Sequence, residues 1–166
     1  MHTQSTTTVV ILGIDPGLAN TGWGVIEKTG SQKRPIAYGC ITTVAEDGVA
    51  TRLRQIYHEI LAVIERYQPA ELAIEAVYFG ANTKTALSTG EARGAVLVAA
   101  AERQLAIGEY SPTQIKQVTV GAGRAQKQQT QYMVKTLLKL DHQPTPDHAA
   151  DALAVALCHA QLRALG

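Results

Sequence analysis

Two acidic residues of this chain each follow directly on a short apolar run. Asp15 comes after residues 9–14 and precedes a Pro16-Gly17 turn, and Glu75 comes after residues 72–74. An ionised carboxylate is costly to bury unless a cation or hydrogen-bond donors lie close by. Asp15 has a local explanation, because Asp is often found as the cap of such a turn. The alternative is that the two acids share a cation.

A further group of candidate ligands lies in the segment DHAADALAVAL, which begins at Asp147. His148 and Asp151 are three residues apart, and Asp147 and Asp151 are four apart, so either pair can share one face of a helix. Asp147 has a structural explanation, because an acid in the first turn complements the helix dipole. Asp151 has none, since it lies among apolar residues of a helix that we expect to be buried. The other histidines lack an acidic neighbour at helical spacing and are assigned no role: His2, His58, His142 and His159.

Three acids and an imidazole would form a site for Mg²⁺ or Mn²⁺. Oxygen ligands favour these hard cations, and one nitrogen ligand shifts the preference towards manganese. Two such ions, about 3.5 to 4 Å apart, would activate a water molecule and stabilise the leaving oxygen in the displacement of a phosphodiester. The predicted chemistry is therefore metal-dependent phosphodiester hydrolysis at Asp15, Glu75, Asp151 and His148.

A mixed sheet would bring the two strand-end acids together. Three strands joined by short polar turns are predicted over residues 9–15, 22–26 and 36–44, as an antiparallel meander with the first strand near its centre. Apolar residues at helical spacing then predict a helix over residues 50–67. A helical crossover makes the next strand, residues 72–75, parallel and adjacent to the first. Asp15 and Glu75 should therefore be neighbours.

The second half of the chain is expected to be mainly helical. Residues 85–104 are predicted to form a helix that is apolar on nearly every side through residues 95–101 and contains Gly90 and Gly94. Such a helix must be covered on more than one side, so we predict that it also forms a twofold dimer contact. A fifth strand is predicted over residues 107–110, with helices over 112–118, 124–140 and 146–164. The fold class is therefore α/β, with a five-stranded mixed sheet flanked by helices.

The basic residues are unevenly distributed. The net charge is +1, but residues 110–140 contain five basic residues and no acidic one, which leaves ten basic and fourteen acidic residues elsewhere. The five are Lys116, Arg124, Lys127, Lys135 and Lys139. Such a segment indicates a polyanionic partner, because phosphates are bound by local patches of charge. A solvated helix face is the alternative.

The loop after Glu75 contains two adjacent aromatic residues, Tyr78 and Phe79. One explanation is that an aromatic side chain fixes the loop to the core. The other is that it stacks on a nucleic-acid base, a contact that contributes about 1 to 3 kcal/mol.

Length and composition indicate one globular domain over residues 9–166, after a disordered polar lead-in at residues 1–8. This lead-in lacks the features of a signal peptide, and no apolar run is long enough to span a bilayer. We therefore expect a cytoplasmic protein without membrane contact. Cys40 and Cys158 are not in a CxxC arrangement, which favours two reduced thiols.

Five segments together resemble the RuvC-type Holliday junction resolvases, the crossover junction endodeoxyribonucleases of the ribonuclease H-like fold. They are GIDPGLANTGWGVI, AIEAVYF, GEARGAV, IKQVTVGAGRAQK and DHAADALAVAL, in the order of the family. By this resemblance, Asp15 and Glu75 take the positions of the two strand-end catalytic acids, and His148 and Asp151 those of the helix pair. The family often has Asp where this chain has His148, which affects the metal preference more than the mechanism.

The resemblance also implies DNA contacts and partners. Tyr78 matches an aromatic that engages bases at the crossover, and Lys116 and Lys127 match basic DNA-contacting positions. The family implies a homodimer that nicks two opposing strands of a four-way junction symmetrically, in homologous recombination and DNA repair, with RuvA and RuvB as partners. Two alternatives are a ribonuclease H-like hydrolase of RNA–DNA hybrids and a catalytically silent junction-binding protein. An actin-like kinase would need two such domains, which 166 residues cannot accommodate.

Overall fold

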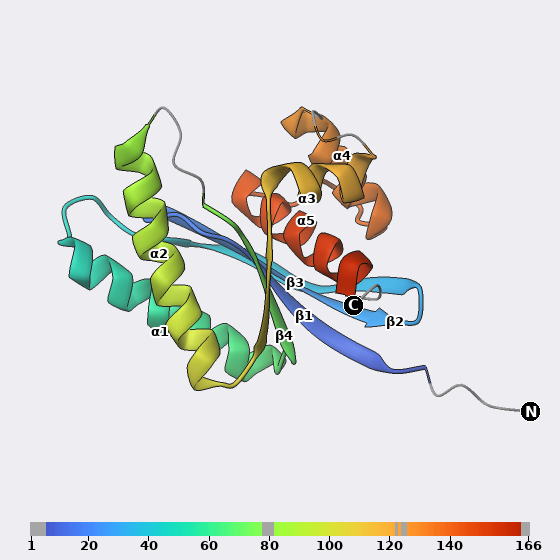
Figure 1. Cartoon of the computed structure of the whole chain (residues 1–166), viewed down its shortest axis with the longest axis horizontal. Helices are drawn as coiled ribbons and strands as arrows, with labels where there is room; N and C mark the ends of the chain where they lie inside the picture. Colours follow the sequence, from blue (N-terminus) through green and yellow to red (C-terminus); the bar gives the residue numbers. More distant parts are fainter. Residues whose placement is uncertain (1–5, 78–81, 122, 124–125, 164–166) are drawn as a thin grey trace, which may run out of the picture.

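A five-stranded mixed sheet with strand order β3-β2-β1-β4-β5 forms the centre of the computed structural model (Figure 1). The model describes residues 6–77, 82–121, 123 and 126–163. The strands are β1 (Thr8–Asp15), β2 (Asn20–Thr29), β3 (Gln32–Thr42), β4 (Glu71–Glu75) and β5 (Ala106–Tyr110). The first three are antiparallel, and β1, β4 and β5 are parallel. The predicted fold class is confirmed, although Thr8 belongs to β1 and not to the lead-in.

The hairpin of β2 and β3 is longer than the sequence predicts. The residues expected to form a polar turn continue the two strands, and the turn itself is at Gly30, whose φ is 61°. Glu27 and Arg34 form an ion pair of 3.0 Å across the hairpin. Polar residues occur here because β3 is an edge strand that does not need to bury both of its faces.

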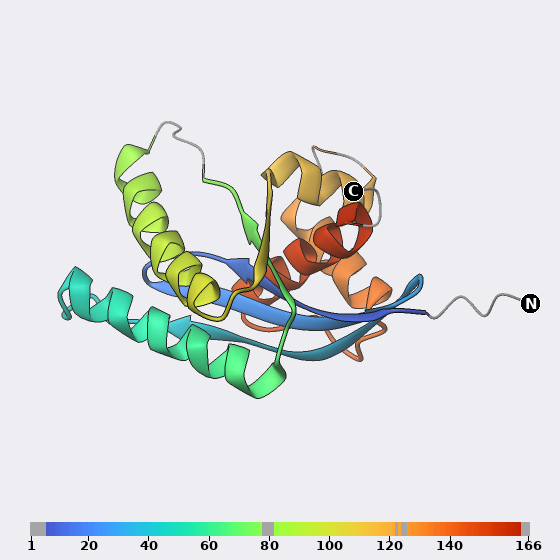
Figure 2. The same ribbon diagram turned by 60° about the horizontal axis from the view of Figure 1, so that its bottom comes forward.

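Helices cover the two faces of the sheet separately (Figures 1 and 2). One face carries α1 (Val49–Tyr67) and α2 (Thr83–Glu102), and the other carries α3 (Pro112–Val120), α4 (Lys127–Leu137) and α5 (Asp147–Leu162). The helix predicted over residues 124–140 is shorter than expected. It begins after a capping box formed by Gln126 and Gln129, and Lys139 has a positive φ of 53° that does not continue the helix.

Alternation along the strands decides which side chains meet which helices. In β1, Leu12 and Ile14 belong to the core beneath α1 and α2, whereas Ile11 belongs to the core beneath α5. Since side chains alternate between the two faces, Asp15 lies on the α5 side. In β4, Ala73 belongs to the α5 core, and Glu75 therefore also lies on that side. Both acids thus face the helix that carries His148 and Asp151.

The helix α5 is the most buried helix described. Its residues from Ala149 to Ala160 are buried except Asp151, which is only partly exposed. Among the residues that the structure describes, no helix is both long and apolar enough to cross a membrane.

Candidate active site

The two strand-end acids meet at one edge of the sheet, as the crossover argument predicts. Ile14 pairs with Ile74 in the parallel ladder of β1 and β4, and Asp15 and Glu75 are the next residues on the two strands. Both acids line a cavity of about 430 Å³. The topology therefore brings together two carboxylates that are 60 residues apart in the chain.

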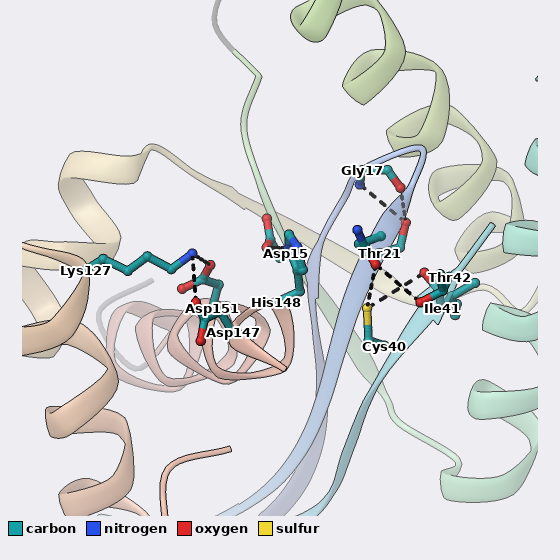
Figure 3. A network of polar contacts seen from close by, with 11 residues as sticks. Asp15, Gly17, Thr21, Cys40, Ile41, Thr42, Lys127, Asp147, His148 and Asp151 are labelled. Atoms are coloured by element: carbon teal, nitrogen blue, oxygen red, sulfur yellow. Dashed lines mark hydrogen bonds and ion pairs between the residues drawn. The ribbon is translucent and has the colours of Figure 1, made fainter. Parts of the chain in front are cut away.

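The first turns of α5 add His148 and Asp151 to this edge. His148 Nδ1 lies 3.3 Å from Asp15 Oδ2. One candidate ligand atom from each of Asp15, His148 and Asp151 lies within 4.8 Å of the others. Figure 3 shows His148 beside Asp15, with Asp151 on the same side of the helix. The structure thus brings His148 and Asp151 to Asp15, whereas Asp147 is outside this group and its side chain is 64% exposed.

Glu75 lies beside this three-residue group without belonging to it. It lines the first cavity together with Asp15 and a second cavity of about 230 Å³ together with Asp151. The carboxylate of Glu75 therefore lies between the two cavities, within electrostatic range of both aspartates.

The turn after β1 does not depend on Asp15. The hydroxyl of Thr21 donates to the carbonyl of Gly17 at 2.6 Å and accepts from its amide at 3.3 Å (Figure 3). Thr21 is fully buried. This side chain closes the turn, which weakens the purely structural explanation for Asp15.

Burial and mutual repulsion make the acids costly to ionise. Burial, followed by the charge of Asp151, raises the pKa of Asp15 to about 6, although the hydrogen bond and charge of His148 oppose the shift. Burial, followed by the charges of Asp15 and Asp151, raises the pKa of Glu75 to about 7. Burial also raises the pKa of Asp151, against the opposing effect of Lys127. Clustered carboxylates of this kind are stabilised by a bound cation.

Two of the four predicted DNA-binding residues lie next to the acids. Lys127 Nζ is 3.4 Å from Asp151 Oδ2 and 3.8 Å from Asp147 Oδ2 (Figure 3). Lys116 and Lys127 both line the second cavity. Lys116 is presented by α3, whose start is fixed by a capping box between Ser111 and Gln114. The other two predicted residues, Tyr78 and Arg124, lie outside the described residues.

The sequence prediction missed the polar wall of the first cavity. Three residues near the start of α2 line this cavity opposite the acids: Asn82, Thr85 and Thr89. Thr85 and Thr89 are four residues apart, so they lie on one face of the helix. That spacing is visible in the sequence, but it does not reveal which face of the helix points towards the acids.

Carboxylates gathered where two adjacent parallel strands end, under a helix that adds an imidazole and a further acid, define a metal-dependent nuclease of the ribonuclease H-like class. Comparison with known proteins narrows this class. The chain belongs to the RuvC family, because the family model described as crossover junction endodeoxyribonuclease RuvC matches residues 11–159.

Relatives match nearly the full length of this chain. The crossover junction endodeoxyribonuclease RuvC of Desulforamulus reducens is 50% identical over 153 residues, which cover 92% of this chain and 94% of the relative. The structure of Thermus thermophilus RuvC is 37% identical, with a TM-score of 0.86, and covers 95% of this chain and 96% of that chain. The structure of T. thermophilus RuvC in complex with a Holliday junction substrate is 36% identical over the same shares, with a TM-score of 0.90.

Proposed function

We propose that this protein is an endonuclease that resolves four-way DNA junctions by symmetric nicks in two opposing strands, in homologous recombination and DNA repair. The observation that carries the proposal is the convergence of Asp15, His148 and Asp151 beside Glu75, next to a basic segment. Membership of the RuvC family supports the choice of substrate, since a T. thermophilus relative is solved with a Holliday junction substrate.

The donor set fits a hard divalent cation. Three carboxylates and one imidazole are the ligand types that Mg²⁺ and Mn²⁺ accept, and burial, followed by the neighbouring carboxylates, raises the pKa values of Asp15 and Glu75. We assign Asp15, Glu75, His148 and Asp151 as the residues that hold Mg²⁺ or Mn²⁺, with two ions in each site. When bound, these ions supply an activated water and stabilise charge on the leaving oxygen.

The residues around the acids have separable tasks in this proposal. Asp15 accepts from His148 Nδ1 when the imidazole carries a proton there, which fixes the ring against β1. Lys116 and Lys127 supply positive charge at the second cavity, where it can bind the phosphates of the DNA strand. The proposed products carry 5′-phosphate and 3′-hydroxyl ends.

Tyr78 and Arg124 stay as proposed DNA contacts. Tyr78 follows Glu75 by three residues, so a loop that holds it lies close to the acids in sequence. An aromatic at this place would stack on an unpaired base at the crossover. Arg124 belongs to the basic segment together with Lys116 and Lys127.

We propose that the working unit is a homodimer formed through α2. The outward side of α2 carries the exposed apolar side chains of Leu87 and Val98. Between them, the space above Gly90 and Gly94 is open, so that another backbone could approach closely there. Two copies related by a twofold axis would present two sites to two strands of one junction. RuvA and RuvB as partners and a cytoplasmic location also remain proposals, drawn from the family resemblance.

Cleavage of defined substrates tests the function. Purified protein is mixed with a labelled four-way junction, the matching linear duplex or an RNA–DNA hybrid, with Mg²⁺ or Mn²⁺. We expect paired nicks in the junction and little cleavage of the duplex or the hybrid. Hybrid cleavage without junction cleavage would contradict the proposal, as would junction binding without any cleavage. The variant Asp15→Asn is the control, which should bind the junction without nicking it.

A further inference from the structure

Gly22 on β2 lies directly opposite Asp15 on β1. The two residues are partners in the antiparallel register, and both lie on the side of the sheet that α5 covers. Positive φ among the described glycines occurs only at Gly30 and Gly121. The backbone of Gly22 therefore does not itself require glycine, and the requirement must come from the space around it.

The first turn of α5 fills the space where a side chain at Gly22 would lie. A Cβ atom built on Gly22 would overlap the carbonyl oxygen and carbon of His148 and would lie 3.0 Å from its Cβ. The overlapping atoms belong to the helix backbone, so no change of rotamer can move them. Only a displacement of the first turn of α5 and β2 away from one another would relieve the overlap.

Such a displacement would act directly on the cluster of candidate ligands. His148 Nδ1 is 3.3 Å from Asp15 Oδ2, and the ligand atoms of Asp15, His148 and Asp151 lie within 4.8 Å of one another. The distances from Asp15 to His148 and to Asp151 join β1 to the start of α5. Misplacement of catalytic groups by about 1 Å is enough to reduce a reaction rate by about 100-fold.

Gly24 provides a comparison on the same strand and under the same helix. A Cβ atom built on Gly24 would meet Leu153, mainly its Cδ2 and Cγ atoms at 2.6 and 2.7 Å. A leucine side chain can move to another rotamer, and Leu153 lies more than one turn beyond His148. Alanine at Gly24 should therefore disturb the packing of α5 without pushing its first turn directly.

We propose that Gly22 is a positioning residue of the metal site, because the absence of a side chain there lets the first turn of α5 lie against β2 and brings His148 and Asp151 to Asp15. This inference rests on the proposed function, since it assumes that the cluster holds a divalent cation. The proposal assigns the first glycine of the TGWG segment, Gly22, a role in placing the candidate metal ligands in addition to its role in packing.

The test compares Gly22→Ala with Gly24→Ala in the full chain. Binding of Mn²⁺ to the protein without DNA is measured by calorimetry, and circular dichroism and thermal unfolding report on the fold. We expect Gly22→Ala to fold, to bind the junction in EDTA within about twofold of the unsubstituted protein, and to bind Mn²⁺ at least about tenfold more weakly than Gly24→Ala does. Cleavage by Gly22→Ala should fall about 100-fold at limiting Mn²⁺ and recover in part as Mn²⁺ is raised.

Two results would overturn the proposal: failure of Gly22→Ala to fold, or a loss of Mn²⁺ affinity no greater than that of Gly24→Ala. In either case Gly22 would be a packing residue like Gly24. The variant Gly48→Ala controls for a glycine substitution as such, because no atom lies within 4 Å of a Cβ built there. If the unsubstituted protein binds Mn²⁺ but leaves the junction intact, the proposed function fails, and the comparison of the two variants still decides the role of Gly22.

Discussion

The carboxylates of Asp15 and Glu75 reduce the stability of the metal-free fold at neutral pH. Their pKa values are raised to about 6 and about 7, from ordinary values of 3.8 and 4.5. Between these limits the folded protein holds more protons than the unfolded chain, so its stability decreases as the pH rises. Ionised acids that repel one another at the proposed cation site are thus a cost in stability that the metal-free fold carries.

We predict that Glu75→Gln stabilises the metal-free protein at high pH. In EDTA at about pH 8, the variant should exceed the unsubstituted protein by roughly 1 to 3 kcal/mol in the free energy of unfolding, because it no longer buries a charge among like charges. At about pH 4 the difference should largely disappear, since Glu75 is then protonated in the folded protein. Urea unfolding at several pH values measures this. A variant that is less stable at high pH would show that the Glu75 carboxylate stabilises the fold.

Lys127 is the basic residue whose contribution to DNA binding can best be isolated. Its ammonium pairs with Asp151 and lines the second cavity, whereas Lys139 is exposed beyond the end of α4. We predict that Lys127→Ala weakens junction binding and lowers the slope of log K against log salt by about 1, as expected for one lost phosphate contact. Lys139→Ala is the matched control and should change the slope less. Equal slopes for Lys127→Ala and the unsubstituted protein would show that Lys127 does not contact a phosphate and belongs to a solvated helix face.

At the scale of single residues, the sequence predicted contacts only where a local pattern carried the information. Asp15 and Glu75 could be paired because each ends an apolar strand and a helix separates the strands. His159 could not be assigned a role, because its partner Glu71 is 88 residues away and no spacing rule connects them. His159 has no acidic neighbour at helical spacing, as the sequence indicates, but the fold brings Glu71 of β4 to its ring.

Polar side chains of β4 and α5 lie near one another at both ends of the pair, and hydrogen bonds connect the two elements at the Glu71 end. At one end Glu75 and Asp151 share a cavity. At the other, Glu71 accepts from Arg163 at 2.6 and 2.7 Å, and its Oε2 is 2.6 Å from His159 Nε2. The other ring nitrogen of His159 lies 2.6 Å from the hydroxyl of Tyr110 on β5. This cluster fixes α5 along the two parallel strands, and so helps to hold Asp151 in register with Glu75.

Replacing Glu71 should therefore reduce the stability with which α5 packs on β4. We predict that Glu71→Gln loses about 1 to 3 kcal/mol of the free energy of unfolding at pH 7, since the carboxylate that accepts from His159 and Arg163 is replaced by an uncharged amide with one acceptor oxygen. The hydrogen bond from Arg163, followed by that from His159, lowers the pKa of Glu71, so this stabilisation is present above about pH 4.5 and is lost as the pH falls through the lowered value. Denaturant unfolding at pH 7 and below pH 4 measures both effects.

Glu65→Gln is the matched control for Glu71→Gln. Glu65 also pairs with an arginine, Arg103, at 3.0 Å, but its side chain is 67% exposed. An exposed pair of this kind contributes about 0 to 1 kcal/mol. If the two substitutions cost the same, the cluster around Glu71 is an ordinary surface ion pair and does not fix α5.

Element boundaries were predicted well where the hydrophobic pattern was regular and less well where polar residues continue an element. The helix α1 and the strands β4 and β5 lie within one residue of their predicted ends. The hairpin of β2 and β3 was predicted too short, because its polar residues are typical of a turn. At the edge of a sheet such residues can continue the strands. The start of α4 was predicted three residues too early, because the capping box at Gln126 uses glutamine, which is a weak signal of a helix start in a sequence.

Charge is distributed over the whole molecule in a way that matches its proposed task. The basic segment is carried mainly by α3 and α4, which lie on the same side of the sheet as α5 and the acids (Figure 1). A polyanion attracted to this side would be brought to the edge where Asp15 and Glu75 lie. The net charge of +1 alone does not reveal this. The site needs both a local negative cluster for cations and positive charge around it for phosphates.

The outward face of α2 leads to a prediction about the whole assembly. Leu87 and Val98 are 62% and 54% exposed, although the apolar residues of a surface helix normally face the core. If this face joins two copies, Val98→Glu places two like charges across the twofold axis and should yield a folded monomer in sedimentation equilibrium. Its nicks in a four-way junction should then be uncoupled, so that singly nicked junctions accumulate.

The control is Val44→Glu, at a residue outside α2 that is 52% exposed, which should leave the dimer intact. A dimer that survives Val98→Glu with paired nicking would show that α2 does not form the twofold contact, and the two sites would have to be brought together through another surface.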